Sequence, residues 1–387
     1  MDVFLLLLAL LGHAFLWIGL VNRLHSVGVR RWMVGIVTLG CFASAALIPF
    51  LVGWWYLQHR AMEGILGIYI VVCLMAVAIT LLRLVYLRIF RKMPSVVRFH
   101  GRQPVKINLD RAAVTPDETV HHFMARLPLN EILRLELTRW DFDVPGLAPE
   151  LDGLSIAQLS DWHLTGRVGK AYFREVVRAC NELQPDLVCI TGDIVDAVAC
   201  LDWIDDTLGQ LTARHGVYFI LGNHDLRAAP DRLRVVLKEN GLIDLGGRSQ
   251  CIEINGRPVV LAGNESPWID GRGLAEQSLR QETAGALRIV LSHSPDQLAW
   301  AQAQHVDLML AGHTHGGQIR IPPLGAIFSP TASGVEHTAG VFYAPPTIMH
   351  VTRGISGDIP VRWNCPPEIA LLRLRAIKRT SHCDRAP

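Results

Sequence analysis

The chain has 387 residues, a net charge of +2 and a mean hydropathy of +0.27. This length exceeds one typical domain and leaves room for a second unit. The small net charge gives no global bias toward nucleic acid, so we expect no nucleic-acid partner. The hydropathy is high for a soluble protein, and the apolar excess is concentrated near the N-terminus.

Three apolar runs follow one another within the first ninety residues, over 3–21, 32–57 and 64–82. Each reaches the ~18 residues that are typical of a membrane helix. The first run is an unconvincing signal peptide, because Asp2 stands where a basic region is expected and no clear cleavage site follows. We predict a membrane anchor over residues 1–92 with three transmembrane helices, and three buried core helices are the alternative.

The distribution of basic residues predicts the orientation of this anchor. The first loop carries Arg23, Arg30 and Arg31, whereas Arg60 in the second loop is offset by Glu63. A basic stretch follows the third run: Arg83, Arg88, Arg91, Lys92, Arg98, Arg102 and Lys106. We therefore expect a multi-pass protein of the inner (cell) membrane whose chain is cytoplasmic after residue 83. The basic stretch lies against anionic headgroups or is a plain stop-transfer flank.

The eight cysteines form no C-x-x-C pair, and their spacing fits neither a zinc motif nor a disulfide framework. Residues 93–131 are mixed in composition and carry Pro94, Pro104 and Pro116, so we interpret them as a connector. A domain is predicted over residues 132–377, followed by a C-terminal tail over 378–387.

Hydrophobic strands that end in polar tips recur throughout the predicted domain. Examples are "GLSIAQLS", "PDLVCITGD", "VYFILGNHD", "RIVLSHSPD" and "DLMLAGHTHGG". "LRLELTRWDFDV" alternates like a strand with one wet face, and "KAYFREVVRACNEL" has apolar residues at helical spacing. Alternating strands and helices predict an α/β domain, in which ligands bind beyond the carboxyl ends of the strands.

Five of these strand tips carry residue types that bind divalent metals: Asp161 and His163; Asp193; Asn223, His224 and Asp225; His293; His313 and His315. Carboxylate, imidazole and amide ligands suit Mn²⁺, Fe or Zn²⁺ better than Ca²⁺. The set is too large for one ion, and two ions need a shared carboxylate, for which Asp193 after Gly192 is the natural candidate. Asp196 either supports the ligands from outside or begins a helix.

The five motifs together resemble the calcineurin-like metallophosphoesterases, in particular their membrane-associated branch. The family pattern D-x-H, G-D, G-N-H-[DE], H and G-H-x-H is matched between about residues 140 and 375, and "GHTHGGQIRIPPLG", "VTRGISG" and "PPEIALLRL" extend the likeness. The resemblance implies a β-sandwich flanked by helices, preceded here by the transmembrane helices. It does not reach the membrane runs, which rest on hydropathy alone.

The resemblance also implies roles for individual residues. Asp161, His163 and His315 would hold one ion, Asn223, His293 and His313 a second, and Asp193 would bridge them. His224 would be the catalytic histidine that contacts phosphate and protonates the leaving oxygen, while Asp225 either orients His224 or caps the following turn. A hydroxide held between two cations attacks phosphorus in line, and the cations neutralise charge on its oxygens. Trp162 and "NES" at 264–266 depart from the family pattern; Trp162 shapes the pocket or packs.

We therefore expect a membrane-anchored, metal-dependent hydrolase that contains manganese, iron or zinc. Its substrate is a phosphoester or pyrophosphate, with a lipid-linked or nucleotide-sugar-lipid compound as one candidate. The alternative is a catalytically inactive metal-binding scaffold at the membrane. A transporter is disfavoured, because the three runs contain no Asp, Glu, Lys or Arg and only His13 is ionisable in the first. The sequence leaves the oligomeric state open.

Overall fold

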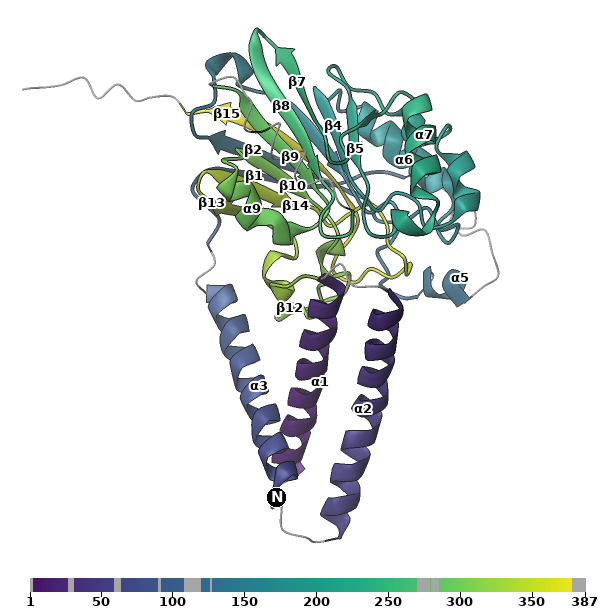
Figure 1. The fold of residues 1–387 in the computed structure, drawn as a ribbon, viewed down its shortest axis with the longest axis vertical. Coiled ribbons are helices and arrows are strands. Elements are labelled where there is room, and N and C mark those ends of the chain that lie inside the picture. Colours follow the sequence, from purple (N-terminus) through teal and green to yellow (C-terminus); the bar gives the residue numbers. More distant parts are fainter. Residues whose placement is uncertain are drawn as a thin grey trace, which may run out of the picture.

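The structure is a computed structural model that describes residues 3–26, 31–58, 64–89, 92–107, 120–125, 127–269, 279 and 285–377. The predicted tail over 378–387 lies outside the described residues. Long helices form one end of the molecule and a layered α/β domain forms the other (Figure 1). The long helices are α1 (Val3–Ser26), α2 (Arg31–Leu57) and α3 (Ile65–Ile89).

A helix covers each of the three apolar runs. Helices α1 and α3 continue a few residues past the ends of their runs, and α2 begins one residue before its run. Within the described residues, two stretches are long and apolar enough to cross a membrane, Val3–Leu24 and Gly67–Leu87, whereas α2 contains a shorter apolar stretch over Gly35–Leu51. His13 joins α1 to α3, because its Nδ1 lies 2.6 Å from the Tyr69 hydroxyl. This contact fits a role in helix packing.

The domain is a β-sandwich of two mixed sheets with helices on its outer faces (Figure 1). The seven-stranded sheet has the order β1-β2-β15-β3-β4-β5-β6. Its strands are β1 (Val97–Pro104), β2 (Glu136–Val144), β15 (Glu368–Ala376), β3 (Ser155–Leu159), β4 (Leu187–Thr191), β5 (Val217–Ile220) and β6 (Ile243–Asp244). Strands β3 to β6 are parallel, and β15 runs antiparallel to β3.

The six-stranded sheet has the order β13-β14-β10-β9-β8-β7. Its strands are β13 (Gly340–Ala344), β14 (Thr347–Val351), β10 (Leu308–Ala311), β9 (Leu287–Ser292), β8 (Arg257–Asn264) and β7 (Ser249–Ile254). The four central strands β14, β10, β9 and β8 are parallel. A separate two-stranded hairpin is formed by β11 (Arg320–Ile321) and β12 (Gly325–Ala326).

The main core fills the space between the two sheets, where side chains such as Ile156, Leu291 and Leu310 are fully buried. A second core lies between the seven-stranded sheet and the helices α6 (Lys170–Asn181) and α7 (Pro230–Glu239). The short helix α9 (Leu298–Ala303) covers the other sheet. Helix α5 (Val120–Ala125) precedes β2. The predicted α/β sandwich flanked by helices is confirmed.

The segment interpreted as a connector is more structured than expected, because residues 97–104 within it form strand β1. This strand pairs along its length with β2 and places the edge of the seven-stranded sheet shortly after the end of α3. Pro104 is compatible with this strand, because it is the last residue of an edge strand, where a backbone N–H is not needed for pairing.

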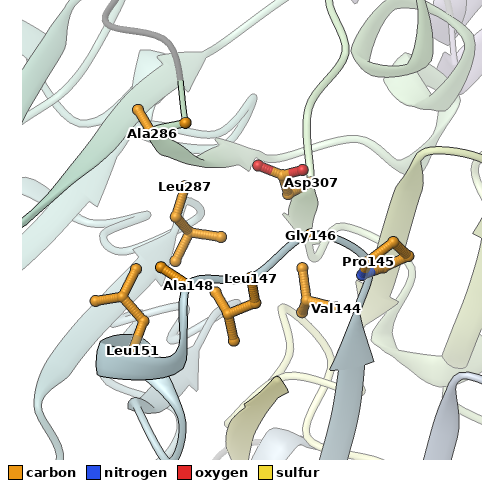
Figure 2. Close-up of a pocket in the computed structure, with 10 residues that line it drawn as sticks. Val144, Pro145, Gly146, Leu147, Ala148, Leu151, Ala286, Leu287 and Asp307 are labelled. Atoms are coloured by element: carbon orange, nitrogen blue, oxygen red, sulfur yellow. The ribbon is translucent and has the colours of Figure 1, made fainter. Parts of the chain in front are cut away.

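A cavity of about 180 Å³ lies at the end of the sandwich where β9 and β10 begin (Figure 2). It is lined by Val144, Leu147, Leu151 and Leu287, and by Asp307, whose carboxylate accepts the backbone N–H of Arg288. The predicted ligands follow the other ends of these strands. This cavity is therefore remote from the candidate site.

Candidate metal centre

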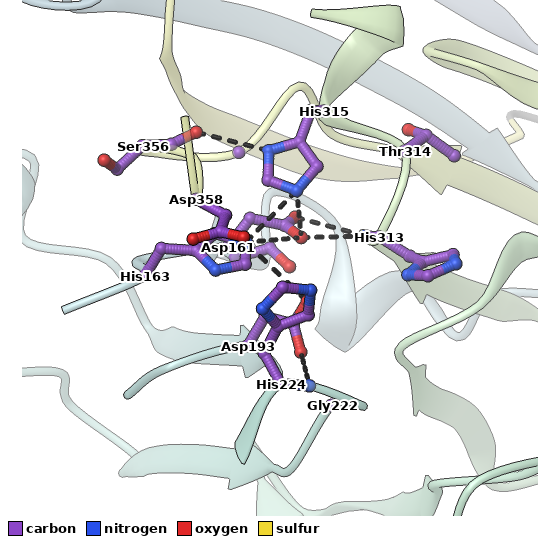
Figure 3. A network of polar contacts seen from close by, with 12 residues as sticks. Asp161, His163, Asp193, Gly222, His224, His313, Thr314, His315, Ser356 and Asp358 are labelled. Atoms are coloured by element: carbon purple, nitrogen blue, oxygen red, sulfur yellow. Dashed lines mark hydrogen bonds and ion pairs between the residues drawn. The ribbon is translucent and has the colours of Figure 1, made fainter. Parts of the chain in front are cut away.

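The predicted ligands follow five parallel strands that belong to both sheets. Asp161 and His163 follow β3, Asp193 follows β4, and Asn223 follows β5, while His293 follows β9 and His313 and His315 follow β10. The carboxyl ends of these strands meet at one end of the sandwich, so side chains from distant parts of the sequence converge there (Figure 3).

One cluster combines Asp161, His163, Asp193 and His315, each of which offers a ligand atom within 4.8 Å of the others. The Nε2 atoms of His163 and His315 are 3.1 Å apart. Asp161 Oδ1 lies 3.6 Å from His315 Nε2, and Asp193 Oδ2 lies 3.7 Å from His163 Nε2. All four side chains therefore point at one small volume.

A second cluster combines Asp193, His293 and His313. The Nε2 atom of His293 lies 3.1 Å from Asp193 Oδ2 and 3.2 Å from Asn223 Oδ1, so the Asn223 side chain joins the group. Asp193 belongs to both clusters. A shared carboxylate between two ligand groups is the arrangement that two neighbouring cations require.

The hydrogen bonds of His293 show why this donor set fits a cation. Its Nδ1 lies 2.7 Å from the Thr191 carbonyl oxygen, which can only accept, so Nδ1 carries a proton. A neutral ring then directs the Nε2 lone pair at the oxygens of Asp193 and Asn223. Burial by itself would lower the pKa of His293, but Asp193 and Asp161 outweigh burial and raise it to about 9, so the ring holds a second proton, on Nε2, when no cation is present. The oxygens around Nε2 therefore favour a positive charge at this point, and a bound divalent cation would supply it.

The two carboxylates lead to the same conclusion. Asp161 and Asp193 are almost completely buried, and among the described residues their ion pairs are only with histidines. Burial raises the pKa of Asp161, because a carboxylate in a dry site lacks solvation. A buried anion persists when a cation or hydrogen bonds compensate it. The candidate metal-binding cluster is therefore also the place where these acids obtain their counter-charge.

The backbone around the ligands is held in an unusual conformation. Five predicted ligands have a positive φ, a region that non-glycine residues rarely adopt: Asp161 53°, His163 45°, Asp193 52°, His313 70° and His315 51°. Gly222 allows the loops to approach closely, since a Cβ there would lie 2.2 Å from Asp193 Oδ1. Such strain is typical of functional sites that the surrounding structure over-determines.

Asp196 supports two histidines at once. Its Oδ2 lies 2.7 Å from His163 Nδ1 and its Oδ1 lies 2.5 Å from His224 Nδ1. Burial raises the pKa of the Asp196 carboxyl, but the two histidines outweigh burial and hold it well below its usual range. Of the two interpretations that the sequence left open, support of the ligands from outside is therefore correct. His224 lies beside the ligands, with its ring centroid 4.6 Å from that of His163.

Asp225 has a different role from either of those expected. Its carboxylate accepts the backbone N–H groups of Ile194, Val195 and Gly222, each at 2.8 Å. It ties the loop after β4 to the loop after β5 and thereby fixes the spacing of Asp193 and Asn223. His224 is oriented by Asp196 instead.

The two departures from the family pattern are structural. Trp162 is fully buried and packs against Phe173, with ring centroids 6.0 Å apart, so it does not line the site. Within "NES", the Glu265 carboxylate accepts the backbone N–H of Leu221 and pairs with Arg234. These contacts hold the strand before Asn223.

Several residues near the centre had no clear sequence signal. Trp268 lies against the ligand rings, 4.7 Å from His313 and 5.5 Å from His293 between centroids. Arg227 places its guanidinium 3.4 Å from His224 Nε2. Buried Arg362 donates to the carbonyl oxygen of His315 at 2.8 Å and so fixes that loop. Only Arg227 could have been suspected, because it stands one turn after His224.

The comparison with known families agrees with this geometry. Residues 154–317 match the model of the calcineurin-like phosphoesterases. The fold, the site and this match together define a calcineurin-like metallophosphoesterase domain over residues 154–317. It is accordingly a metal-dependent phosphoric ester hydrolase, as the sequence predicted.

Three curated relatives illustrate the range of similar proteins. The chain is 29% identical over 56% of its length to Phosphodiesterase YaeI of Escherichia coli, covering 80% of that protein. It is 25% identical over 62% of its length to UDP-2,3-diacylglucosamine pyrophosphatase LpxG of Chlamydia muridarum, covering 89% of it. It is 33% identical over 54% of its length to a Transmembrane protein with metallophosphoesterase domain of Danio rerio, covering 52% of it.

Proposed function

We propose that this protein is a membrane-anchored, two-metal hydrolase that cleaves a phosphoester or pyrophosphate bond in a lipid-linked substrate at the cytoplasmic face of the inner membrane. The observation that carries the proposal is the pair of ligand clusters that share Asp193. In this proposal residues 1–92 form the anchor and 132–377 form the catalytic domain, to which the connector adds β1.

The ligands divide between two sites. Asp161, His163 and His315 with Asp193 would hold one ion, and Asn223, His293 and His313 with Asp193 would hold the other. Manganese, iron and zinc each accept this mixture of nitrogen and oxygen donors. When bound, two such ions lower the pKa of water and neutralise charge on the phosphate oxygens.

His224 is placed to manage the proton of the leaving group. Asp196 accepts from His224 Nδ1, which leaves Nε2 as the atom that gains or loses a proton. The same carboxylate stabilises the charged imidazolium. Arg227 lies beside Nε2 and adds positive charge where the anionic substrate would bind. Proton transfer by a positioned histidine typically contributes ~10²–10⁴-fold to the rate.

An apolar rim next to the metal loops supports a substrate with a lipid part. We define the rim as Ile319, Ile359 and Trp363, whose exposed fractions are 42%, 51% and 44%. The two segments are held together by Gln318, whose side chain donates to the Ile359 carbonyl at 2.8 Å and whose own carbonyl accepts from the Trp363 N–H. Exposed apolar clusters of this kind favour an interaction with lipid. The similar LpxG protein is named as a pyrophosphatase of UDP-2,3-diacylglucosamine, a compound that carries acyl groups.

The arrangement of the helices supports the cytoplasmic orientation. The end of α1 and the start of α2 lie on the side of the catalytic domain (Figure 1). Arg23 near the end of α1 and Arg83 and Arg88 in the last turns of α3 lie on this side, and the positive-inside rule assigns such basic flanks to the cytoplasm. Arg83 of α3 pairs with Glu336 at 3.0 Å, so the anchor contacts the domain directly.

The test is Mn²⁺-dependent hydrolysis by the full-length protein in lipid nanodiscs. The probe is bis(p-nitrophenyl) phosphate, and the variants are Asp193→Asn and, as the matched control, Asp206→Asn, which removes an exposed acid paired with Lys170 and Arg174. We expect turnover that Asp193→Asn abolishes and the control retains. A UDP-linked sugar is then compared with and without acyl chains, and a preference for the acylated form is expected.

Two results would contradict the proposal in different ways. Metal binding without turnover on any phosphoester or pyrophosphate would indicate the inactive scaffold. Equal rates on acylated and unacylated compounds would refute the lipid-linked substrate and leave the hydrolase intact.

A further inference from the structure

An apolar slot lies between the last membrane helix and the β11–β12 hairpin. Its volume is about 320 Å³, and its walls are Leu81, Leu84 and Leu87 of α3 on one side and Pro323, Leu324 and Val335 on the other. The side chain of Leu324 is 44% exposed although it is part of this wall. The slot is distinct from the metal centre, because none of its residues is a predicted ligand.

The position of the slot along α3 indicates what fills it. The candidate span ends at Leu87, so the helix wall occupies the last two turns, within roughly 9 Å of the span's end at 1.5 Å per residue. At that depth in a bilayer the solvent is the upper part of the acyl chains. The hairpin therefore covers a stretch of the helix that lipid would otherwise contact.

A basic pocket of about 260 Å³ adjoins the slot. Four basic side chains line it, and three of them, Lys92, Arg102 and Arg320, form no ion pair within the described part of the chain. The acid in this pocket, Glu368, is already neutralised by Arg353 at 2.9 Å. The pocket thus has uncompensated positive charge just beyond the end of the span.

Arg320 lines both the slot and the basic pocket. The slot lies at the depth of acyl chains and the basic pocket at the depth of headgroups, and the two meet at Arg320. They therefore match the acyl chain and the phosphate of one phospholipid molecule. Trp140, which lines the basic pocket, also carries a buried indole N–H without a hydrogen-bond partner among the described residues. A headgroup oxygen offers an acceptor for such donors.

We propose that this protein binds one anionic phospholipid, with the phosphate against Lys92, Arg102 and Arg320 and an acyl chain in the slot beside α3. The site lies outside the metal centre and does not depend on hydrolytic activity. The bound lipid would join the anchor to the catalytic domain, because Arg320 also donates its backbone N–H to the Trp363 carbonyl at 2.9 Å. That contact lies in the segment that follows His315.

The test is native mass spectrometry of the full-length protein in detergent, with phosphatidylglycerol or phosphatidylcholine added. We expect selective retention of one phosphatidylglycerol molecule. Arg320→Gln should weaken that retention about five-fold, the loss expected for one basic residue at an anionic lipid, and leave phosphatidylcholine unaffected. The matched control is Arg257→Gln, an exposed arginine on β8 that is paired with Glu150, and it should retain wild-type binding.

Two further arms keep the result decisive. Leu324→Gln should weaken retention of both lipids, because it places a polar group in the slot. Inorganic phosphate should not displace phosphatidylglycerol; displacement would mean a small-anion site and would overturn the lipid assignment. Equal retention of the two lipids by the unaltered protein would also overturn it. If Arg320→Gln fails to fold, as judged by its melting temperature, Arg102→Gln serves as the test variant.

Discussion

Replacing Asp196 by asparagine tests the support of the metal centre most directly. Each carboxylate oxygen of Asp196 accepts from one imidazole, Oδ2 from His163 and Oδ1 from His224. An amide has one acceptor oxygen and one donor nitrogen, so it cannot accept from both rings. If the amide nitrogen faces His163, that ring shifts its proton to Nε2 and loses its lone pair for the metal. If the amide nitrogen faces His224, it donates to Nδ1, so the neutral ring carries its proton at Nε2. The charged form of the ring then also lacks the carboxylate that stabilised it.

The magnitude follows from these two cases. Loss of a partner behind a ligating histidine typically lowers metal affinity or activity by about 10–100-fold. Loss of the carboxylate behind a catalytic histidine reduces kcat by up to about 10⁴-fold in a serine protease, where the wrong tautomer is the cause. We therefore expect Asp196→Asn to lower kcat/KM by at least about 100-fold, with Asp206→Asn as the neutral control.

The assay measures the initial rate against Mn²⁺ concentration at saturating substrate. A shift of the Mn²⁺ midpoint identifies the His163 case, and a lower plateau with an unchanged midpoint identifies the His224 case. Activity and midpoint both within about three-fold of the unaltered protein would refute the assigned role of Asp196.

Four further predictions follow from the structure. Gly222→Ala should abolish metal-dependent turnover, since its Cβ would lie 2.2 Å from Asp193 Oδ1; a folded, fully active variant would contradict the geometry. Removal of divalent cations by a chelator should lower the melting temperature and abolish turnover, and saturating Mn²⁺ should restore both; about 4 kcal/mol of stabilisation is expected at a thousand-fold excess over Kd. Arg227→Gln should raise KM more than it lowers kcat, because the guanidinium adds charge for the bound anion; steady-state kinetics check this, and an unchanged KM would count against it. Burial raises the pKa of Glu368, but Arg353 outweighs it and brings the value to about 2 from 4.5. This shift contributes about 3 kcal/mol to the free energy of unfolding, which is present in full above pH ~4.5 and is lost as the pH falls toward 2. In urea unfolding, the free energy of unfolding of Glu368→Gln should therefore change less with pH across this range, and an unchanged pH dependence would contradict the assignment.

The sequence by itself indicated the class of the fold and the predicted ligands of the candidate site, although it missed strand β1. Strands that are apolar throughout, such as β4 and β10, must be buried on both faces, and this predicts a layered α/β domain. Because parallel strands present their carboxyl ends together, polar residues such as Asp193 and His313 at those ends were expected to converge. The apolar runs likewise predicted long helices, since their length and lack of charge are local properties.

Only the tertiary structure decided which neighbours complete the site. Trp162 directly follows Asp161 yet packs into the core, whereas Trp268, from a distant loop, lies against the ligand rings. Arg362 reaches His315 from a segment nearly fifty residues away. Such contacts depend on where two loops meet after the sheets have packed, and no local periodicity encodes that distance. The same reason applies to the β11–β12 hairpin, whose place beside α3 depends on how the domain packs against the N-terminal helices.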